Sequence, residues 1–256
     1  VSFSRPSNVL PWGVAVPDDP DQVMYLWCDA ISNYITAVDS EHEGELFHYW
    51  PADLHIIGKD ILRFHAGIWI GMLLSAGYAV PRSILVHGFV TSDGQKMSKS
   101  LGNVVDPFLY IDEFGADPLR YFLMKEIPTT DDGDFTRERF LNIYRADLGN
   151  SLGNLVYRVL SMTEKYFDGK IPEKVQKRPF VSLENVSKHY CDAFERRDLK
   201  KALELTMELV NVGNEYVDRE KPWVLAKNDL PRLAWTMYSL LELLRLIAVF
   251  LMPFVP

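Results

Sequence analysis

The first third of the chain alternates short apolar runs with polar, turn-forming residues. Residues 23–27, 54–57 and 84–90 are apolar runs of strand length. Residues 60–76 lie between the last two runs and carry apolar side chains at helical spacing. A strand, a helix and a strand within about 35 residues predict a parallel βαβ unit.

Two polar loops follow directly after predicted strands. They are Gly58-Lys59-Asp60 and residues 91–100. In open α/β sheets, ligands bind beyond the carboxyl ends of the strands. We therefore expect the two loops to share one site.

From Thr136 onward the apolar positions repeat with the longer period of helices, and few strand signals remain. Asp198 is expected to cap one of these helices, since aspartate is a preferred N-cap residue. The segments predicted to be helical are 137–167, 181–196, 199–219 and 231–252. Together they predict an α-helical bundle.

These patterns divide the 256 residues into three segments. We expect an α/β Rossmann-like nucleotide-binding half-domain over residues 1–105 and a connecting segment over 106–145. An α-helical bundle domain is expected over 146–256. A chain of this length is long enough for two modest domains.

Composition narrows the classes of protein that fit. The net charge of −8 argues against indiscriminate nucleic-acid binding, which depends on neutralising phosphates, but leaves a specific RNA partner open. Cys28 and Cys191 are far apart and have no Cys or His at ligand spacing, so we expect neither a disulfide framework nor a metal site. This cysteine usage favours a reducing compartment, either the cytoplasm or the mitochondrial matrix.

The most apolar segment, residues 237–252, is interrupted by Glu242 and Arg245. It is too short and too charged to span a bilayer, so we interpret it as a buried helix and expect no membrane partner. The chain opens at Val1 without an initiator Met, an apolar signal region or an Arg-rich leader, which is typical of an excised or processed piece. The oligomeric state cannot be read from the sequence.

The chemistry is concentrated in Lys96-Met97-Ser98-Lys99-Ser100, which Gly94 and Gly102 bracket. Two lysines three residues apart on a turn-rich segment suit a mobile clamp for phosphate oxygens. Charge alone also fits an ordinary solvated turn. The order of residues 96–100 matches the signature loop of class I aminoacyl-tRNA synthetases letter for letter. Residues 87–105 resemble the methionyl-tRNA synthetase family in particular.

This resemblance implies an ATP site. The segment from His55 to Asp60 is similar to the family's strand-end motif, which assigns Gly58, Asp60, His87 and Val90 to the adenosine. Lys96, Ser98 and Lys99 would then contact the phosphates of ATP, which enters with Mg²⁺. The alternative for Asp60 is that it merely caps the helix that it precedes.

The resemblance also implies a methionine pocket. Residues 27–34 are similar to the family's pocket helix, and the spacing of two aromatic residues on 60–76 matches the other half. Sulfur packs favourably against aromatic edges. Aromatic residues at this spacing are otherwise plain core. Cys28 stands where the family usually has a larger apolar residue, and Ile31 departs from some members, so we expect altered surroundings of the pocket but an unchanged specificity for methionine. The residues assigned to methionine are Trp27, Ala30, Tyr34, His65 and Trp69.

The implied reaction is ATP-dependent activation of methionine to methionyl-adenylate, followed by transfer to methionine tRNA. It needs no covalent enzyme group, so catalysis rests on positioning and on stabilising the departing pyrophosphate. Lys96 and Lys99 are the expected catalytic residues. The family's second signature, His-x-Gly-His, is absent from the sequence. We therefore expect the missing half to precede Val1, and this chain alone to be inactive.

The helical half carries a candidate RNA site. Asn154 and Arg158 lie four apart on one helix face, and Trp223 follows a proline that forces a helix boundary. RNA loops are read by stacking on aromatic rings and by hydrogen bonds to base edges. By resemblance, these three residues would read the methionine anticodon CAU. Otherwise Trp223 fills the bundle and the other two form a solvated stripe.

Three rival functions stay open on the sequence. They are a sister class I synthetase for isoleucine, valine, leucine or cysteine, a catalytically silent tRNA-binding factor, and a nucleotidyltransferase. The aromatic pocket set and the Pro222-Trp223 pair disfavour the first. Intact Lys96 and Lys99 disfavour the second, and the long helical half disfavours the third.

Overall fold

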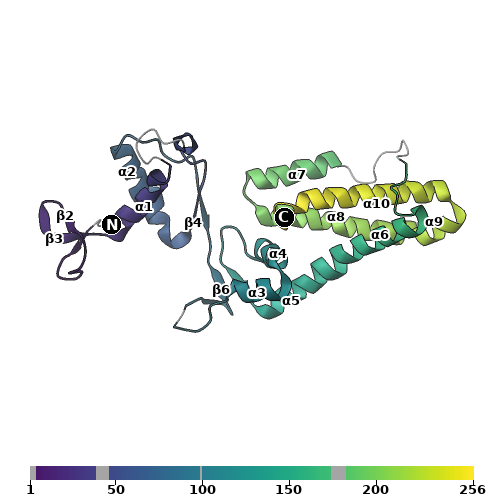
Figure 1. Cartoon of the computed structure of the whole chain (residues 1–256), viewed down its shortest axis with the longest axis horizontal. Coiled ribbons are helices and arrows are strands. Elements are labelled where there is room, and N and C mark those ends of the chain that lie inside the picture. Colours follow the sequence, from purple (N-terminus) through teal and green to yellow (C-terminus); the bar gives the residue numbers. More distant parts are fainter. Residues whose placement is uncertain (1–3, 39–45, 99, 174–182) are drawn as a thin grey trace. The chain divides into compact units, whose positions relative to one another are not determined.

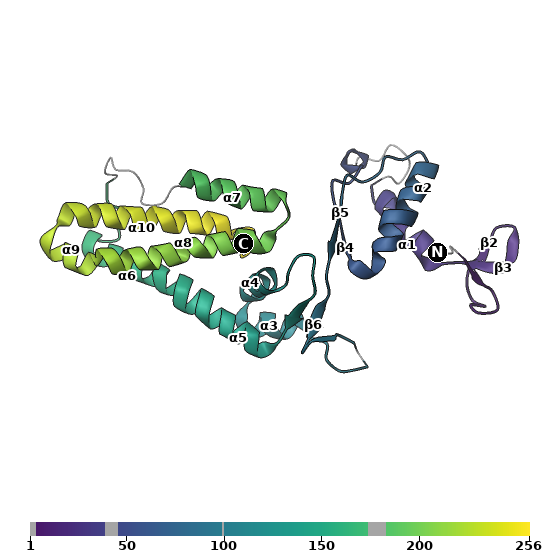
Figure 2. The same cartoon turned by 180° about the vertical axis from the view of Figure 1, so that it is seen from behind.

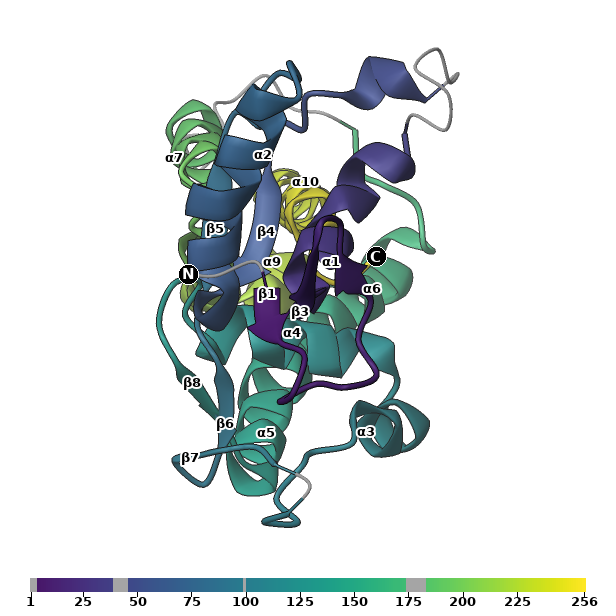
Figure 3. The same cartoon turned by 90° about the vertical axis from the view of Figure 1, so that its left-hand side faces the viewer.

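The computed structural model describes residues 4–38, 46–98, 100–173 and 183–256. The chain divides between His87 and Gly88 into a first unit, residues 1–87, and a second unit, residues 88–256. Figures 1, 2 and 3 show the elements of each unit from three directions. Strands and helices mix in the first unit and at the start of the second, and helices alone follow, which confirms the predicted fold class.

A small antiparallel sheet opens the first unit, with strand order β1-β3-β2. Its strands are β1 (Ser4–Pro6), β2 (Ala15–Val16) and β3 (Asp19–Met24). Helix α1 (Leu26–Thr36) follows after Tyr25, whose backbone is still extended. The predicted strand 23–27 is therefore wrong in its second half, because five apolar residues are too few to separate the end of a strand from the first turn of a helix.

The predicted βαβ unit is confirmed. Strands β4 (His55–Gly58) and β5 (Ile84–His87) pair in parallel, with His55 opposite Ile84 and Gly58 opposite His87. Figure 2 shows the two strands side by side. The helical crossover is not uniformly α-helical, and its parts are the 3₁₀ turn η2 (Lys59–Ile61), the π-helical segment η3 (Phe64–Trp69) and α2 (Ile70–Ser75).

The core of the first unit lies between α1 and the crossover helix. Ile31, Trp69 and Leu73 are at most 2% exposed, and further aromatic side chains pack around them. Along β4, His55 and Ile57 are buried, whereas Ile56 between them is 64% exposed. One face of the β4–β5 ribbon is therefore covered, and Ile56 lies on the other.

The apolar run 84–90, predicted as one strand, is two strands. β5 ends at His87, and β6 (Val90–Ser92) begins the sheet of the second unit. At Gly88 the backbone approaches Asp131 so closely that a Cβ atom would lie 2.1 Å from the Asp131 carbonyl oxygen. The strand breaks where only glycine fits.

In the second unit, β6 lies between two neighbours in the order β7-β6-β8 (Figure 3). The neighbours are β7 (Gln95–Lys96), which is antiparallel to β6, and β8 (Gly133–Phe135), which is parallel to it. Three helices surround this sheet, α3 (Pro107–Phe114), α4 (Ala116–Glu126) and α5 (Arg137–Ile143). Their shared core consists of Tyr110, Leu119, Phe122, Phe135 and Phe140.

The rest of the second unit is the predicted helical bundle. Figure 1 shows α7, α8 and α10 running side by side. The elements are the π-helical segment η4 (Tyr144–Gly153), α6 (Asn154–Phe167), α7 (Leu183–Glu195), α8 (Leu199–Glu220), α9 (Pro222–Asn228) and α10 (Leu230–Leu251). The predicted cap is confirmed, since the Asp198 carboxylate accepts a hydrogen bond from the Lys201 amide. Residues 181–182 of the predicted helix 181–196 lie outside the described residues.

Helix α10 is the most apolar helix of the bundle. Among the described residues it is the one helix with the length and composition of a membrane span. Its apolar character has a second explanation in the bundle, because side chains at intervals of three and four residues are at most 2% exposed. They are Leu233, Met237, Leu240, Leu243 and Ile247.

Candidate functional site

In the first unit, the residues predicted to bind methionine gather between α1 and η3. Trp27, Ala30 and Tyr34 follow one another along one face of α1. The ring of His65 lies 6.4 Å from that of Trp27, and the ring of Trp69 lies 5.9 Å from that of Tyr34. The structure therefore brings the predicted pocket residues together.

Hydrogen bonds fix the polar atoms of this aromatic cluster. His65 Nδ1 lies 3.1 Å from the carbonyl oxygen of Ile61, which can only accept, so Nδ1 carries a proton. In the neutral ring, His65 Nε2 is then an acceptor, and the Tyr34 hydroxyl donates to it over 3.1 Å. The two side chains thus hold each other in one orientation.

One member of the cluster was not selected from the sequence. His55, the first residue of β4, is 5% exposed and accepts a hydrogen bond from the Trp69 indole N–H over 3.2 Å. Burial, followed by the nearby His65, lowers the pKa of His55. The position of His55 at the start of a predicted apolar strand indicated that it is buried. Its hydrogen bond could not be predicted from neighbouring residues, because the partner, Trp69, lies fourteen residues away.

Three residues predicted to bind adenosine meet at the carboxyl end of the β4–β5 ribbon. Gly58 and His87 are register partners at the last position of the two strands. Asp60 follows on η2, and a Cβ atom at Gly58 would lie 2.8 Å from its Oδ1 atom. Asp60 lies inside the turn η2, whose N-cap position is Gly58.

The lysine loop starts from a tight hairpin in the second unit. Asp93 and Gly94 both have positive φ and connect Ser92 of β6 to Gln95 of β7, which is the geometry of a type I′ turn. Lys96 is exposed, and its Nζ atom lies 4.4 Å from the centre of the Phe89 ring. Lys99 lies outside the described residues.

An asparagine and an aspartate, neither of them selected from the sequence, anchor this loop. Asn103 accepts a hydrogen bond from the Ser98 amide at 2.9 Å and donates to the Lys96 carbonyl at 3.3 Å. On β8, Asp134 accepts from the Gly94 amide and the Thr91 hydroxyl, both at 2.7 Å. The same two hydrogen bonds, with that of Gly94 the stronger, lower the pKa of Asp134.

The predicted ATP residues fall in both units. Gly58, Asp60 and His87 belong to the first unit, whereas Val90 on β6 and the lysine loop belong to the second. Each group is well defined by itself. That the two groups of residues form one ATP site stays a prediction.

Asn154 and Arg158 line an open polar hollow of about 430 Å³ between η4, α6 and α8. Arg158 donates a hydrogen bond to Asp218 at 2.6 Å, and the rest of the lining is Ala146, Asn150, Ser151, Asn211, Asn214 and Glu215. Trp223 is 42% exposed on α9, after the chain turns at Lys221, but does not belong to this lining. The structure thus groups two of the three predicted RNA-reading residues.

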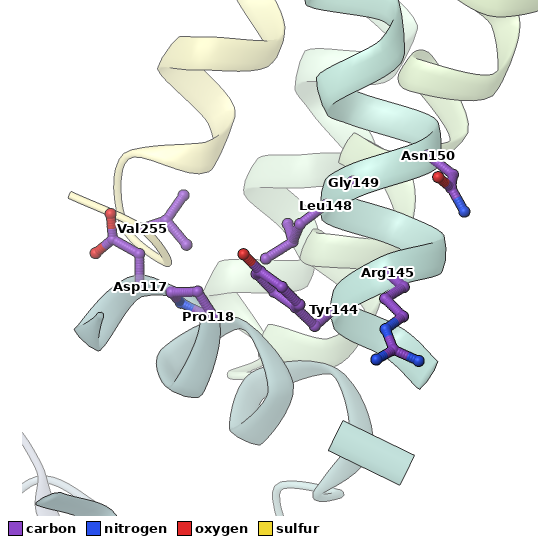
Figure 4. A pocket seen from close by; sticks show the side chains of 8 residues that line it. All are labelled: Asp117, Pro118, Tyr144, Arg145, Leu148, Gly149, Asn150 and Val255. Carbon is purple, nitrogen blue, oxygen red and sulfur yellow. The ribbon is translucent and has the colours of Figure 1, made fainter. Parts of the chain in front are cut away.

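Figure 4 shows a second hollow on the other side of η4, of about 410 Å³. Tyr144 and Leu148 point toward Pro118 and Val255 across it, whereas Asn150 points away on the far side of the helix. The hollow is largely apolar and holds none of the predicted site residues.

No group of three His, Cys, Asp or Glu side chains in the part of the chain that the structure describes is placed to hold a metal ion. The groups that the described residues do present are aromatic rings, strand-end backbone and the exposed Lys96. A strand-end nucleotide motif, an aromatic pocket and a lysine loop are the components of a class I synthetase.

Comparison with known proteins places the chain in that class. A family model described as tRNA synthetases class I (M) matches residues 4–160. A second model, described as the anticodon binding domain of methionyl tRNA ligase, matches residues 169–256. The first match covers more than half of the chain, so the chain belongs to the family of class I tRNA synthetases (M).

Within that class, the similar proteins are methionine–tRNA ligases. The chain is 43% identical to the methionine–tRNA ligase of Thermosynechococcus vestitus, over 99% of this chain and 50% of the relative. It is 42% identical to that of Caldanaerobacter subterraneus, over 97% and 40%. A solved structure of Mycobacterium tuberculosis methionyl-tRNA synthetase in complex with methionyl-adenylate superimposes with a TM-score of 0.90 at 40% identity, covering 100% of this chain and 52% of that one. The chain thus spans about half the length of these relatives.

Proposed function

We propose that the chain is part of a methionine–tRNA ligase, which activates methionine with ATP and transfers it to methionine tRNA. The observation that carries the proposal is the aromatic cluster of Trp27, Tyr34, His65 and Trp69, locked by the bond between Tyr34 and His65. A thioether packs well against such rings. The similarity to a synthetase solved with methionyl-adenylate supports the same substrate.

In this proposal Gly58, Asp60, His87 and Val90 hold the adenosine. A glycine at a strand end lets the nucleotide approach the backbone, and a neighbouring aspartate suits the ribose hydroxyls. The exposed Lys96, with Ser98 and Lys99, neutralises charge on the departing pyrophosphate. The anchors Asn103 and Asp134 hold the base of that loop, so the backbone at Lys96 and Ser98 is already positioned when ATP binds.

ATP takes part as its Mg²⁺ complex, whose ion draws charge away from the phosphates. Mg²⁺ in nucleotide sites is commonly held by phosphates, water and one or two carboxylates instead of a cage of protein ligands. The chain's own contribution is then to hold the phosphates.

We place the RNA contact on the helical half. Asn154 and Arg158, which line the polar hollow, would read base edges of the CAU anticodon, and the exposed Trp223 would stack on a base. The domain limits 1–105, 106–145 and 146–256, and a reducing compartment such as the cytoplasm or the mitochondrial matrix, belong to the same proposal.

The proposal includes the inactivity of this chain by itself. Class I synthetases carry a His-x-Gly-His signature, which this sequence lacks. A parent protein would supply it from a preceding segment. Methionine-dependent exchange of pyrophosphate with ATP by the purified 256-residue chain would contradict this part of the proposal.

The test of the function is amino-acid-dependent exchange of pyrophosphate with ATP by the parent protein, run with all twenty amino acids. Methionine alone should support exchange. Exchange with another amino acid would indicate a sister synthetase. No exchange with any amino acid, together with tight binding of tRNA, would indicate a silent binding factor.

A further inference from the structure

In the second unit, the ammonium group of Lys96 lies against an aromatic ring that the proposed reaction does not use. Its Nζ atom is 4.4 Å from the centre of the Phe89 ring. This distance is within the range of a cation–π contact, in which the negative face of a ring attracts a positive charge. Phe89 is half-buried, so its ring also belongs to the surface on which the exposed lysine lies.

The register of the hairpin brings these two side chains together. Lys96 of β7 lies opposite Thr91 of β6. Side chains two residues apart on a strand point to the same face, and the diagonal neighbour of a cross-strand pair is within reach of a long side chain. Phe89, two residues before Thr91, is therefore the diagonal neighbour of Lys96. The next residue, Met97, packs against the core of the β7-β6-β8 sheet and its helices instead.

The backbone is fixed at both ends of this contact. The Phe89 amide donates to the Asp132 carboxylate at 2.8 Å, and the Phe89 carbonyl accepts from the Gly133 amide at 3.0 Å. The Lys96 carbonyl accepts from the Asn103 side chain at 3.3 Å. The freedom that remains is mainly that of the lysine side chain, and the ring restricts it.

A ring holds an ammonium group without neutralising it. A carboxylate in its place would pair with the lysine, and each incoming phosphate would have to displace that carboxylate. The Asp134 carboxylate, which belongs to the residue in register with Thr91, accepts from the Gly94 amide and the Thr91 hydroxyl. Lysine has a long flexible stem, and a side chain ordered before the substrate binds loses less freedom when it makes its contact.

We propose that Phe89 is a positioning residue for the activation of methionine, whose ring holds the Lys96 ammonium group ready for the phosphates of ATP. The proposal rests on the proposed function for the role of Lys96 at the pyrophosphate. Phe89 directly precedes Val90, which the proposed function assigns to the adenosine. A cation–π contact at an exposed site is equivalent to a change of about two- to fivefold in a rate or an equilibrium constant.

The contact itself can be tested in the 256-residue chain, without any reaction. Reductive ¹³C-methylation of the lysines keeps their charge and gives methyl signals strong enough for a dilute sample. The Lys96 signal, which is the one that disappears in Lys96→Gln, should lie upfield of the other lysines, because its methyl protons lie over a ring. It should move to the ordinary position in Phe89→Leu and stay upfield in Phe89→Tyr. An ordinary position in the wild type would overturn the inference.

The effect on catalysis is tested in the parent protein by pyrophosphate exchange. Phe89→Leu should lower kcat/KM for ATP about two- to fivefold, with KM for methionine unchanged, because the ring serves only the lysine. Phe89→Tyr, which keeps a ring, should recover most of the loss. Phe108→Leu is a matched control, since it removes a ring that is 68% exposed on α3, and it should change neither constant.

A double-mutant cycle separates the holding of Lys96 from a general effect on the loop. In a Lys96→Ala background there is no ammonium group to hold, so Phe89→Leu should leave the remaining rate unchanged. A disturbed loop would act through Ser98 and Lys99 as well and would lower the rate in both backgrounds. Equal losses in both backgrounds would overturn the inference, and so would an unchanged rate in Phe89→Leu. If Phe89→Leu does not fold, the position of the Lys96 signal in the wild type decides.

Failure of the function and failure of the inference give different results. A parent that exchanges pyrophosphate with methionine, combined with a Lys96 signal at the ordinary position, supports the function and overturns the inference. A parent with no exchange for any amino acid contradicts the function and, with it, the role of Phe89 in activation. An upfield Lys96 signal would then support only the contact between the two side chains.

Discussion

At the scale of single residues, side chains that hold others in place are as prominent as those proposed to touch substrate. Asn103 and Asp134 anchor the lysine loop, and His55 occupies the donor of Trp69. The sequence did not single out these residues. The hydrogen-bond partners of Asn103, Asp134 and His55 lie seven, forty and fourteen residues away from them, respectively. The aromatic pocket set was predictable from its match to a family motif, which carries the long-range information that spacing alone does not.

Lys96 is expected to act on the chemical step. In Lys96→Ala, the rate of methionine activation should fall about a hundredfold or more, since one preorganised contact to developing charge is worth about 3 kcal/mol. Binding of methionine should change little, because the lysine serves the pyrophosphate. Pre-steady-state measurement of adenylate formation in the parent protein checks this. Equal losses in rate and in methionine affinity would remove Lys96 from the proposed role.

Trp223 is expected to act on tRNA alone. In Trp223→Ala, binding of methionine tRNA should weaken by about 1 to 3 kcal/mol, the worth of one stacked base. Pyrophosphate exchange with methionine should stay near the wild-type rate. Trp235→Ala on α10, outside the proposed RNA site, is a control for the loss of an indole. The assignment fails if discrimination between CAU and altered anticodons is unchanged in Trp223→Ala.

Protonation of His55 should make stability depend on pH. Its folded pKa lies below the ordinary 6.5, so between the two values the unfolded chain binds a proton that the folded chain does not. Stability should therefore fall as the pH is lowered through 6.5. Urea denaturation at pH 7.5, 6.5 and 5.5 measures it. His55→Gln should lose this component of the pH dependence, and an identical slope in the variant would assign the effect to other groups.

At the scale of elements, long helices could be predicted from the sequence, whereas very short elements could not. The long helices of the bundle were predicted to within a few residues where they are described, because a long apolar period is unambiguous, whereas the seven-residue α9 was missed. The strand β8 was missed, since Gly133–Phe135 is only three residues long and pairs with β6 more than forty positions earlier. The π-helical segments η3 and η4 were also missed, because their apolar spacing resembles that of an α-helix.

The junction between β5 and β6 depends on Gly88. Gly88→Ala should destabilise the second unit by about 1 to 3 kcal/mol, the usual effect of forcing an atom into a closed space, because its Cβ would collide with the Asp131 backbone. Gly71→Ala on α2 is a matched control, since no atom lies within 4 Å of its Cβ position. It should stabilise by about 0.5 to 1 kcal/mol. Thermal unfolding compares the two, and equal shifts would contradict the close approach at Gly88.

At the scale of the whole molecule, the helical bundle and the β4–β5 ribbon differ in how completely their apolar side chains are covered. The helical bundle has a closed core in which long helices bury one another. The β4–β5 ribbon is a pair of parallel strands, and parallel strands are normally covered on both faces and flanked by further strands. The predicted α/β and helical halves were readable from periodicity, whereas the number of strands that belong to the sheet was not.

The exposed Ile56 on β4 has a consequence for handling the protein. An apolar side chain in mid-strand, beside strands that have no further pairing partner among the described residues, is a template for self-association. The 256-residue chain produced alone should therefore precipitate or form oligomers as its concentration rises. Ile56→Lys should keep it monomeric in light scattering, whereas Ile171→Lys, at an exposed position outside any strand, should not. The parent protein should need no such substitution.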